Sequence, residues 1–497
     1  MNHSIKDKPI VWSVAGSDCS GLAGQVADIR AIEALGAHPC MITTAVTAQN
    51  SRKVLAINPL NEEQIRSQFN ALKEDLPASV IKVGLLPTLD AINALKDFLK
   101  EYHGKLIVDP VMISSSGAQL MDQAAQEAFK TLFDKIDLLT PNIPELELLT
   151  QRKIKKLQDI EFAVDDILSA GVKAVLVKGG HANEDFCADY FCSDAVSEVS
   201  ESFWLINDRL HNDNTRGTGC VLAASIASAW SLNYSLKDAV VIGKMQINQA
   251  IENGYRIGKG KGPLKPLSWP AKQDYMPRLT KNLHTEFYNF PNCGEEPLGL
   301  YPVVDRAQWL ERLLPLGVTT IQLRVKDLEG DELEQEIVNA ISIAEKYSAR
   351  LFINDYWQIA IKHQAYGVHL GQEDSDDADI AAIAKAGLRL GVSTHCYYEV
   401  ARAHAIQPSY LACGPVYHTD SKQMPWIPHG VENLSYWKST MSEYPWVAIG
   451  GIDMQKITEV AHTGVSGIAM ISAITHAEQP ELAAQQMIEL INKHTLQ

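Results

Sequence analysis

The chain has 497 residues, of which 46% are hydrophobic and 21% are charged, within the range of folded globular proteins. Its formal net charge of −16 argues against binding to the phosphate backbone of nucleic acids and to anionic membrane surfaces. Because the length exceeds that of one ordinary hydrophobic core, two domains of roughly 200–270 residues are expected.

The cysteines and the N-terminus indicate the compartment. The eight cysteines form no CxxC pair and no zinc-type spacing with histidine, so reduced thiols are expected. The N-terminus lacks the apolar region of a signal peptide, and no apolar run approaches the roughly 18 residues of a membrane span. We therefore expect a cytoplasmic protein that binds neither nucleic acid nor membrane.

From Pro9 to about Gly262, short apolar strands alternate with helices. The segments PIVWSVAGS, SVIKVGLL and KAVLVKGG are almost continuously apolar, as are strands covered on both faces. This alternation predicts an α/β domain with a mainly parallel sheet over residues 1–262. Residues 263–297 are rich in Pro, Lys and Asn without a sustained period, which predicts a linker that could contain a short helix.

Residues 298–497 return to alternating strands and helices. Strand-like segments such as TTIQLR, RLFIND, GVHLG and WVAIGG are separated by helical ones such as DELEQEIVNAISIAEKYSA. About eight such units in roughly 200 residues is the count of a (β/α)8 TIM barrel, in which function lies at the C-terminal ends of the strands.

In the first domain, Gly217, Thr218, Gly219 and Cys220 precede a helix of small apolar residues. Glycines let consecutive backbone N–H groups point at one place, and the helix N-terminus adds partial positive charge, so this turn suits a phosphoryl group. A helix N-terminus also favours a thiolate, which at Cys220 could accept the proton of an attacking alcohol. The alternative is a buried structural cysteine, and the spacing alone leaves both open.

Other polar residues follow predicted strands of the same domain. Asp109 could meet a magnesium-bound phosphate, and Lys178 could neutralise a phosphate as a point charge. Asn142 and Glu145 follow a third strand. Each alone is typical of a solvated loop, but together they fit ligand binding at the C-terminal edge of an open α/β sheet.

The stretches AGSDCSGLAGQVADI, TAVTAQN, KVGLL, VDPVM, TPNIPE, KGGH and NTRGTGC resemble those of the bifunctional hydroxymethylpyrimidine kinase/phosphomethylpyrimidine kinase family, within the ribokinase superfamily. The resemblance implies a ribokinase-like three-layer α/β/α fold and a cysteine where most relatives have an aspartate base. It implies three sets of site residues: pyrimidine contacts at Gly16, Asp28 and Gln49; ATP and Mg²⁺ contacts at Asp109, Asn142, Glu145 and Lys178; and an anion hole at Gly217, Thr218 and Gly219.

The chain departs from this family at three positions. It has Cys19 where Pro is usual, Leu22 where Gly is usual and Arg216 where His is usual. Leu22 could narrow the pyrimidine pocket, and Arg216 could add a phosphate contact. None of the three removes a catalytic group.

In the second domain, Gln322, Arg324 and Lys326 occupy alternate positions, which in a strand place their side chains on one side. Inside a barrel three such polar residues are costly unless a ligand meets them. Asp355 and Asp374 follow neighbouring strands and could share one Mg²⁺, which takes few protein ligands and completes its shell with diphosphate and water. Polar loops are common in any barrel, but that explanation fits this triplet poorly.

The stretches QLRVKD, FINDY, GVHLGQED, GVSTH, GPVYHTDSKQMP, VAIGGI and GIAMISAI resemble those of thiamine-phosphate synthase. The resemblance implies that Mg²⁺ on Asp355 and Asp374 holds a pyrimidine diphosphate together with Arg324, Lys326, Asn354 and Lys422. It implies further substrate contacts, with the thiazole phosphate at Thr419, Ser421, Gly450, Gly451 and Ser472, and others at Gln322, Ser393 and Ile471.

Together the two resemblances imply consecutive steps of thiamine biosynthesis, with ATP as a substrate and Mg²⁺ as cofactor. Two alternatives remain: the first domain could phosphorylate a pyridoxal-type alcohol, or one domain could be a silent binding module. Intact Cys220, Arg324, Asp355 and Asp374 argue against the silent module. Because proteins of both kinds often self-associate, a homodimer is expected.

Overall fold

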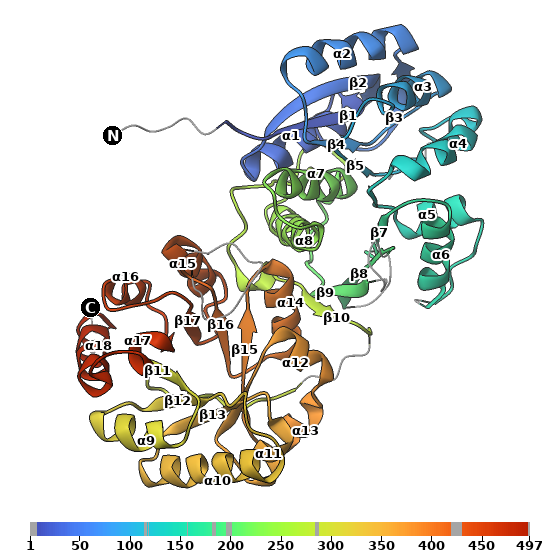
Figure 1. Ribbon diagram of the computed structural model, residues 1–497. Helices are drawn as coiled ribbons and strands as arrows, with labels where there is room; N and C mark the ends of the chain where they lie inside the picture. The colour runs from blue at the N-terminus through green and yellow to red at the C-terminus, as the bar shows by residue number, and fades with distance from the viewer. Residues whose placement is uncertain are drawn as a thin grey trace, which may run out of the picture. The chain divides into compact units, whose positions relative to one another are not determined.

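The computed structural model describes residues 7–113, 117, 119–156, 158–180, 185–194, 201–283, 288–418 and 430–495. The chain divides into two compact units, coloured from blue to green and from yellow to red in Figure 1. The first unit comprises Met1–Pro270 with Asp274–Thr285, and the second comprises Ala271–Gln273 with Glu286–Gln497.

The first unit is built on a ten-stranded sheet in the order β10-β9-β8-β7-β6-β5-β4-β1-β2-β3. The strands are β1 (Ile10–Asp18), β2 (His38–Gln49), β3 (Val54–Pro59), β4 (Val80–Val83), β5 (Lys105–Val108), β6 (Leu138–Leu139), β7 (Ala174–Val177), β8 (Phe186–Ser193), β9 (Glu201–Asp208) and β10 (Arg278–Thr280). The six central strands, β7-β6-β5-β4-β1-β2, pair in parallel, as predicted, so their carboxyl ends meet at one edge. The remaining strands, at the two ends of the sheet, pair antiparallel.

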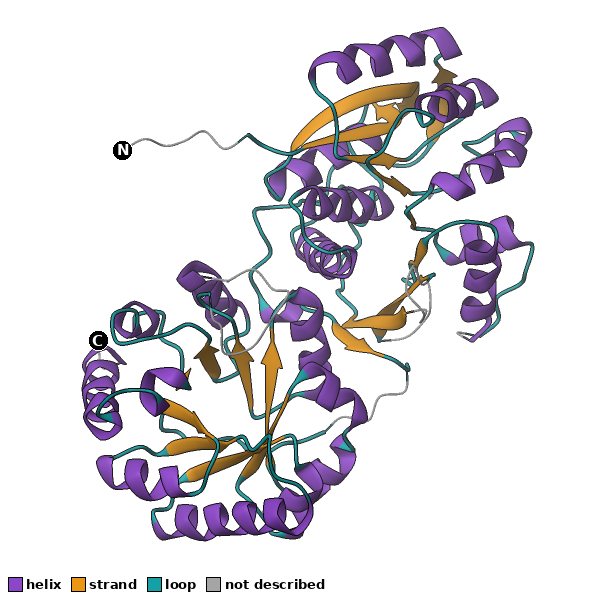
Figure 2. Cartoon of the chain, in the orientation of Figure 1, coloured by secondary structure: helices purple, strands orange, loops and turns teal. Residues whose placement is uncertain are grey.

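Helices cover both faces of this sheet (Figure 2). The helices are α1 (Gly24–Ala34), α2 (Glu62–Asp75), α3 (Leu89–Phe98), α4 (Gln123–Phe129), α5 (Ile143–Thr150), α6 (Gln158–Ser169), α7 (Thr218–Ser231) and α8 (Leu236–Glu252), with 3₁₀ turns η1 (Lys130–Lys135) and η2 (Gln273–Tyr275). Helices α1 and α7 pack on strand β1, and α7 packs on α8. On the other face, Trp12 and Phe69 belong to a continuous apolar core with residues of α3 to α6. The predicted three-layer α/β/α fold is therefore present.

The predicted linker is wrong for its first part. Asn248 Nδ2 donates to the Tyr275 backbone oxygen at 3.0 Å, and strand β10 extends the sheet beside β9. These contacts join residues 274–280 to the first unit.

The second unit is a closed barrel of eight parallel strands, as predicted. The strands are β11 (Gly299–Val304), β12 (Thr320–Leu323), β13 (Arg350–Asn354), β14 (Gly367–Leu370), β15 (Arg389–Thr394), β16 (Tyr410–Cys413), β17 (Trp446–Ile449) and β18 (Gly467–Met470). Its helices are α9 (Gln308–Leu313), α10 (Gly330–Lys346), α11 (Trp357–Lys362), α12 (Gln372–Asp377), α13 (Ile380–Lys385), α14 (Tyr397–Ile406), α15 (Gly430–Thr440), α16 (Ile457–Ala461), α17 (Ser472–Thr475) and α18 (Pro480–Thr495), with a 3₁₀ turn η3 (Leu314–Leu316).

Inward-facing aromatic side chains fill the barrel. Tyr301, Phe352 and Tyr410 are at most 1% exposed and pack on one another with ring centroids 5.1–6.0 Å apart. The closed interior leaves the strand ends as the place for a ligand. Within the described part of the chain, no helix combines the length and apolarity needed to cross a membrane.

Candidate active sites

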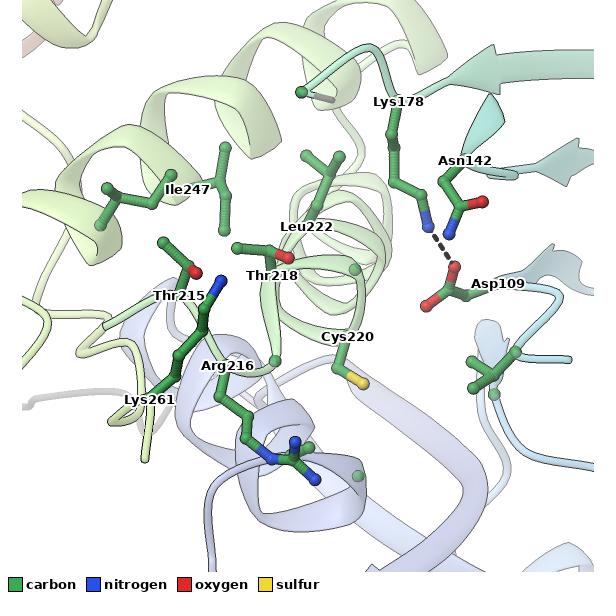
Figure 3. A pocket seen from close by; sticks show the side chains of 18 of the residues that line it. Asp109, Asn142, Lys178, Thr215, Arg216, Thr218, Cys220, Leu222, Ile247 and Lys261 are labelled. Carbon is green, nitrogen blue, oxygen red and sulfur yellow. Dashed lines mark hydrogen bonds and ion pairs between the residues drawn. The ribbon is translucent and has the colours of Figure 1, made fainter. Parts of the chain in front are cut away.

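A cavity of about 740 Å³ opens at the carboxyl edge of the first sheet. Its lining combines residues that follow β1, β5 and β7 with the first turn of α7. In Figure 3, Asp109, Asn142 and Lys178 lie together on one side of this cavity, while Thr215, Thr218 and Lys261 lie on the other. The structure therefore brings the polar strand ends and the glycine turn to one place.

Two glycines at the start of α7 lie close to neighbouring atoms. Gly217 caps the helix with φ near +89°, and a Cβ there would lie 2.8 Å from the Leu22 backbone oxygen. A Cβ on Gly219 would lie 3.0 Å from Asp109 Oδ2 and 3.1 Å from Lys178 Nζ. Glycine thus lets the helix N-terminus, with its free N–H groups, stand directly against this ion pair.

One network of ion pairs and hydrogen bonds joins Asp109, Lys178, Asn142 and Glu145. Lys178 Nζ lies 2.5 Å from Asp109 Oδ1 and 3.9 Å from Glu145 Oε2. Asn142 caps α5, since its side chain accepts from the Glu145 N–H at 2.9 Å and its own N–H donates to Glu145 Oε2 at 2.9 Å. Burial raises the pKa of Glu145 to about 7, with Lys178 acting in the opposite direction. The network holds one cation and two carboxyl groups beside the glycine turn of α7.

Cys220 lies in the same turn and lines the cavity. Burial raises the pKa of its thiol to about 11, and the nearby Lys82 cation lowers it only in part. The expectation that a thiolate is favoured here is therefore wrong. Desolvation, together with the nearby Asp28 and Asp109 carboxylates, outweighs the neighbouring Lys82 cation.

Asp28 does not line the cavity, contrary to the expectation that it contacts the pyrimidine. It is fully buried, accepts from Ser13 Oγ at 2.5 Å, and pairs with Lys82 Nζ at 2.9 Å. Lys82 does line the cavity and was missed. Its signal was a single lysine in the otherwise apolar segment SVIKVGLL, because a buried cation requires a partner.

Gln49 and Gly16 line the cavity, as a pyrimidine site would require. Arg216 donates to Gln49 Oε1 at 2.7 Å, and Gln49 Nε2 donates to Thr47 Oγ1 at 3.0 Å. Arg216 thereby orients the Gln49 amide, a contact that its expected role with phosphate did not include. Leu22, which could have narrowed the pocket, is 3% exposed and does not line the cavity.

In the barrel, Lys326, Asp355 and Asp374 gather beyond the strand ends. Lys326 Nζ lies 2.5 Å from Asp355 Oδ2. Burial and the nearby Asp355 carboxylate raise the pKa of Asp374, because two carboxylates close together repel. Asn354, the residue before Asp355, is 7% exposed. Two carboxylates and one flexible cation thus share the mouth of the barrel.

The expectation that Gln322, Arg324 and Lys326 all lie within one strand is wrong. Strand β12 ends at Leu323, so only Gln322 belongs to it. Gln322 is buried inside the barrel, Arg324 is half-buried at the strand end, and Lys326 is exposed at the mouth. The three side chains therefore stand at different depths.

The remaining barrel residues of the predicted site occupy separate positions. Gly450 and Gly451 have φ near +99° and +66°, and a Cβ on either would lie within 2.7 Å of the chain at Pro415–His418. Ile471 is half-buried, and Ser472 is exposed at the start of α17. Ser393 is half-buried at the end of β15. Three predicted phosphate contacts lie outside the described residues: Thr419, Ser421 and Lys422.

Two family models match the chain, one for each unit. The model described as phosphomethylpyrimidine kinase matches residues 18–265, and that described as thiamine monophosphate synthase matches residues 300–474. The matches follow the division into two units.

Individual proteins are similar over the same two parts. Thiamine-phosphate synthase of Yersinia pseudotuberculosis is 53% identical over 202 residues, 41% of this chain and 94% of that protein. The enzyme of that name from Serratia proteamaculans is 54% identical over 194 residues, 39% of this chain and 92% of that protein. The solved phosphomethylpyrimidine kinase of Clostridium difficile is 34% identical, covering 49% of this chain and 100% of that one, with a TM-score of 0.43.

The pyridoxal kinase of Staphylococcus aureus, solved with AMP-PCP, is 24% identical with a TM-score of 0.50, covering 55% of this chain and 99% of that one. This likeness shows a shared fold for the first unit.

The raised pKa of Cys220 predicts its reactivity. Iodoacetamide should alkylate Cys220 slowly at pH 8 and progressively faster as the pH approaches about 11, because only the thiolate reacts. Mass spectrometry of the alkylated peptides measures the rate, with exposed Cys19 as an internal reference. A rate that is already constant between pH 7 and about 9 would contradict the effect of burial.

The buried Asp28–Lys82 pair predicts an asymmetric effect on stability. Asp28→Ala should lower the free energy of unfolding by about 3–5 kcal/mol, because it leaves Lys82 charged and unpaired in the core. The double variant Asp28→Leu with Lys82→Met should recover most of that loss. Urea unfolding measures both, and equal losses in the two variants would argue against an uncompensated charge.

Proposed function

The chain belongs to the phosphomethylpyrimidine kinase family in its first unit and to the thiamine-phosphate synthase family in its second, and from this we propose a bifunctional enzyme of thiamine biosynthesis. The first unit phosphorylates hydroxymethylpyrimidine to its phosphate and then its diphosphate, using ATP. The second joins this diphosphate to thiazole phosphate and forms thiamine phosphate and inorganic diphosphate.

One observation carries the proposal for the first unit. The N–H groups of the α7 turn, the Lys178 cation and the Cys220 thiol line a single cavity with the predicted pyrimidine contacts Gly16 and Gln49. A donor turn, a cation and a proton-accepting atom beside an alcohol site are the parts that phosphoryl transfer requires.

The acidic groups of this cavity fit Mg²⁺. Asp109 and Glu145 are buried carboxyl groups held beside the anion-binding turn, and Mg²⁺ prefers such oxygen ligands together with phosphates and water. Bound Mg²⁺ would neutralise charge on the ATP phosphates. Lys178 and the N–H groups of the α7 turn then hold the transferring phosphoryl group in line with the alcohol.

The chain's own groups also handle the proton. During transfer, the alcohol oxygen bonds to the γ-phosphorus, the bond to the ADP oxygen breaks, and the alcohol proton leaves. Cys220 Sγ accepts that proton only after losing its own, and its raised pKa opposes this. The buried Lys82 cation reduces that cost. We therefore assign most of the rate enhancement to the positioning of the reacting groups and to the positive charge around the phosphates. Proton acceptance by Cys220 contributes a smaller share.

In the second unit, the fit to Mg²⁺ lies at Asp355 and Asp374, whose mutual repulsion a divalent cation would relieve. Bound Mg²⁺ would neutralise the departing diphosphate. Lys326 and Arg324 add positive charge at the mouth of the barrel. The carbon–oxygen bond breaks with its electron pair on the diphosphate, and the thiazole nitrogen then forms the new carbon–nitrogen bond. This chemistry depends on stabilising the leaving group.

The proposal extends to oligomeric state, where the expected homodimer remains a prediction for analytical ultracentrifugation. A pyridoxal-type substrate is less well supported than hydroxymethylpyrimidine. The pyridoxal kinase of S. aureus shares the fold at 24% identity, whereas the phosphomethylpyrimidine kinase of C. difficile is 34% identical.

Two single variants should each impair one of the two activities and leave the other intact. Cys220→Ala should lower kinase turnover about 100-fold, the low end for a general base, because the resting thiol is protonated. Asp374→Asn should remove synthase activity, because it removes one of two proposed metal ligands. Each variant should keep the other activity, and mixing the two should restore thiamine phosphate formation from hydroxymethylpyrimidine.

Chromatographic assay of each product measures these effects. Cys187→Ala is the matched control, because Cys187 lines the same cavity away from the α7 turn. If Cys187→Ala impaired the kinase as strongly as Cys220→Ala, the special role of Cys220 would be lost.

A further inference from the structure

Five side chains inside the barrel form one continuous chain of hydrogen bonds, here called the polar relay. Gln322 Nε2 donates to Tyr301 OH at 3.3 Å, and Tyr301 OH lies 2.8 Å from Tyr410 OH. Tyr410 OH lies 2.7 Å from His369 Nδ1, and His369 Nε2 lies 2.9 Å from Ser393 Oγ. The relay joins five different strands and ends at two predicted substrate contacts.

The relay has a direction, because each hydroxyl carries one proton. With Gln322 donating to Tyr301, only one arrangement gives each buried hydroxyl proton an acceptor within the relay: Tyr301 donates to Tyr410, and Tyr410 donates to His369 Nδ1. A neutral imidazole then carries its proton on Nε2 and donates to Ser393 Oγ. The hydroxyl proton of Ser393 is left to point elsewhere. At the other end, no described residue donates to Gln322 Oε1.

The surroundings keep the relay neutral. Tyr301, Tyr410 and His369 are at most 7% exposed. Burial raises the pKa of both tyrosines, so each keeps the hydroxyl proton that the hydrogen-bond directions require.

We propose that Tyr301, Tyr410 and His369 are positioning residues, which fix a hydrogen-bond acceptor at Gln322 Oε1 and a donor at the Ser393 hydroxyl. These two groups recognise the pyrimidine ring of the substrate. This inference rests on the proposed synthase function. A 4-aminopyrimidine offers an amino donor beside a ring-nitrogen acceptor, which complements this pattern. A 4-oxopyrimidine offers the opposite pattern. Its carbonyl would require the Gln322 amide to turn and present Nε2, which would reverse the hydrogen bonds from Gln322 through the two tyrosines to His369.

The deletion of one relay hydroxyl tests this. In the full chain, Tyr410→Phe removes the donor to His369 Nδ1 and frees the histidine to change tautomer. We expect the ratio of kcat/KM for the 4-amino over the 4-oxo pyrimidine diphosphate to fall about tenfold, mainly through KM. Inhibition by inorganic pyrophosphate should remain unchanged, because the diphosphate site lies at the mouth.

The matched control is Tyr366→Phe. The Tyr366 ring also packs on Phe352, and its hydroxyl donates to the Cys293 backbone oxygen at 3.2 Å, outside the relay. Tyr366→Phe should leave the ratio unchanged. A loosened core would weaken the binding of both pyrimidine diphosphates and of pyrophosphate alike, and it would leave the ratio unchanged. An unchanged ratio in Tyr410→Phe would therefore overturn the proposal.

A second measurement needs no activity. Nitrogen NMR of the histidine-labelled full chain at pH 7, with His369 assigned by its loss in His369→Gln, should show the Nε2-protonated tautomer. An Nδ1-protonated or doubly protonated ring would refute the relay direction. If the wild-type chain makes no thiamine phosphate from the 4-amino diphosphate, the proposed synthase function fails, and this tautomer still decides whether the relay exists.

Discussion

The first unit depends on the close approach of the α7 turn to the Asp109–Lys178 ion pair. The lack of a side chain at Gly219 favours this approach, since a Cβ there would lie 3.0 Å from Asp109 Oδ2 and 3.1 Å from Lys178 Nζ. A chain with a net charge of −16 repels polyphosphates at long range, so it must attract them with fixed local charges. Free backbone N–H groups at a helix N-terminus, placed against the half-buried Lys178, supply such charge without adding flexible side chains.

The barrel supplies local charge for phosphate binding with side chains instead of backbone N–H groups. Its cations and carboxylates stand beyond the strand ends, where Lys326 pairs with Asp355, while its interior holds neutral hydrogen-bonding groups. Charge at the mouth suits a departing diphosphate, and the neutral groups at the two ends of the polar relay suit recognition of a ring by donors and acceptors. The first unit does not separate charged from neutral groups in this way, because the buried cation Lys82 lines the cavity itself.

The sequence predicted both folds and the edges at which their polar residues gather, because hydrophobic periodicity and strand order determine those features. It did not predict contacts between residues distant in the chain. Asp28 was assigned to substrate, yet it neutralises Lys82, and Arg216 orients Gln49. The Cys220 pKa was misjudged in direction, because desolvation depends on atoms that a motif does not contain. The polar relay was not predicted either, because its five residues come from five strands that are distant from one another in the sequence.

The account's central claim is that one chain carries the pyrimidine alcohol through two phosphorylations and then into thiamine phosphate. The ratio of ADP to thiamine phosphate measures this directly in purified protein with ATP, Mg²⁺ and thiazole phosphate. Two ADP should form per thiamine phosphate from hydroxymethylpyrimidine, one from its phosphate and none from its diphosphate. Thiamine phosphate formed only from the diphosphate, with no ADP from either precursor, would contradict the claim for the first unit.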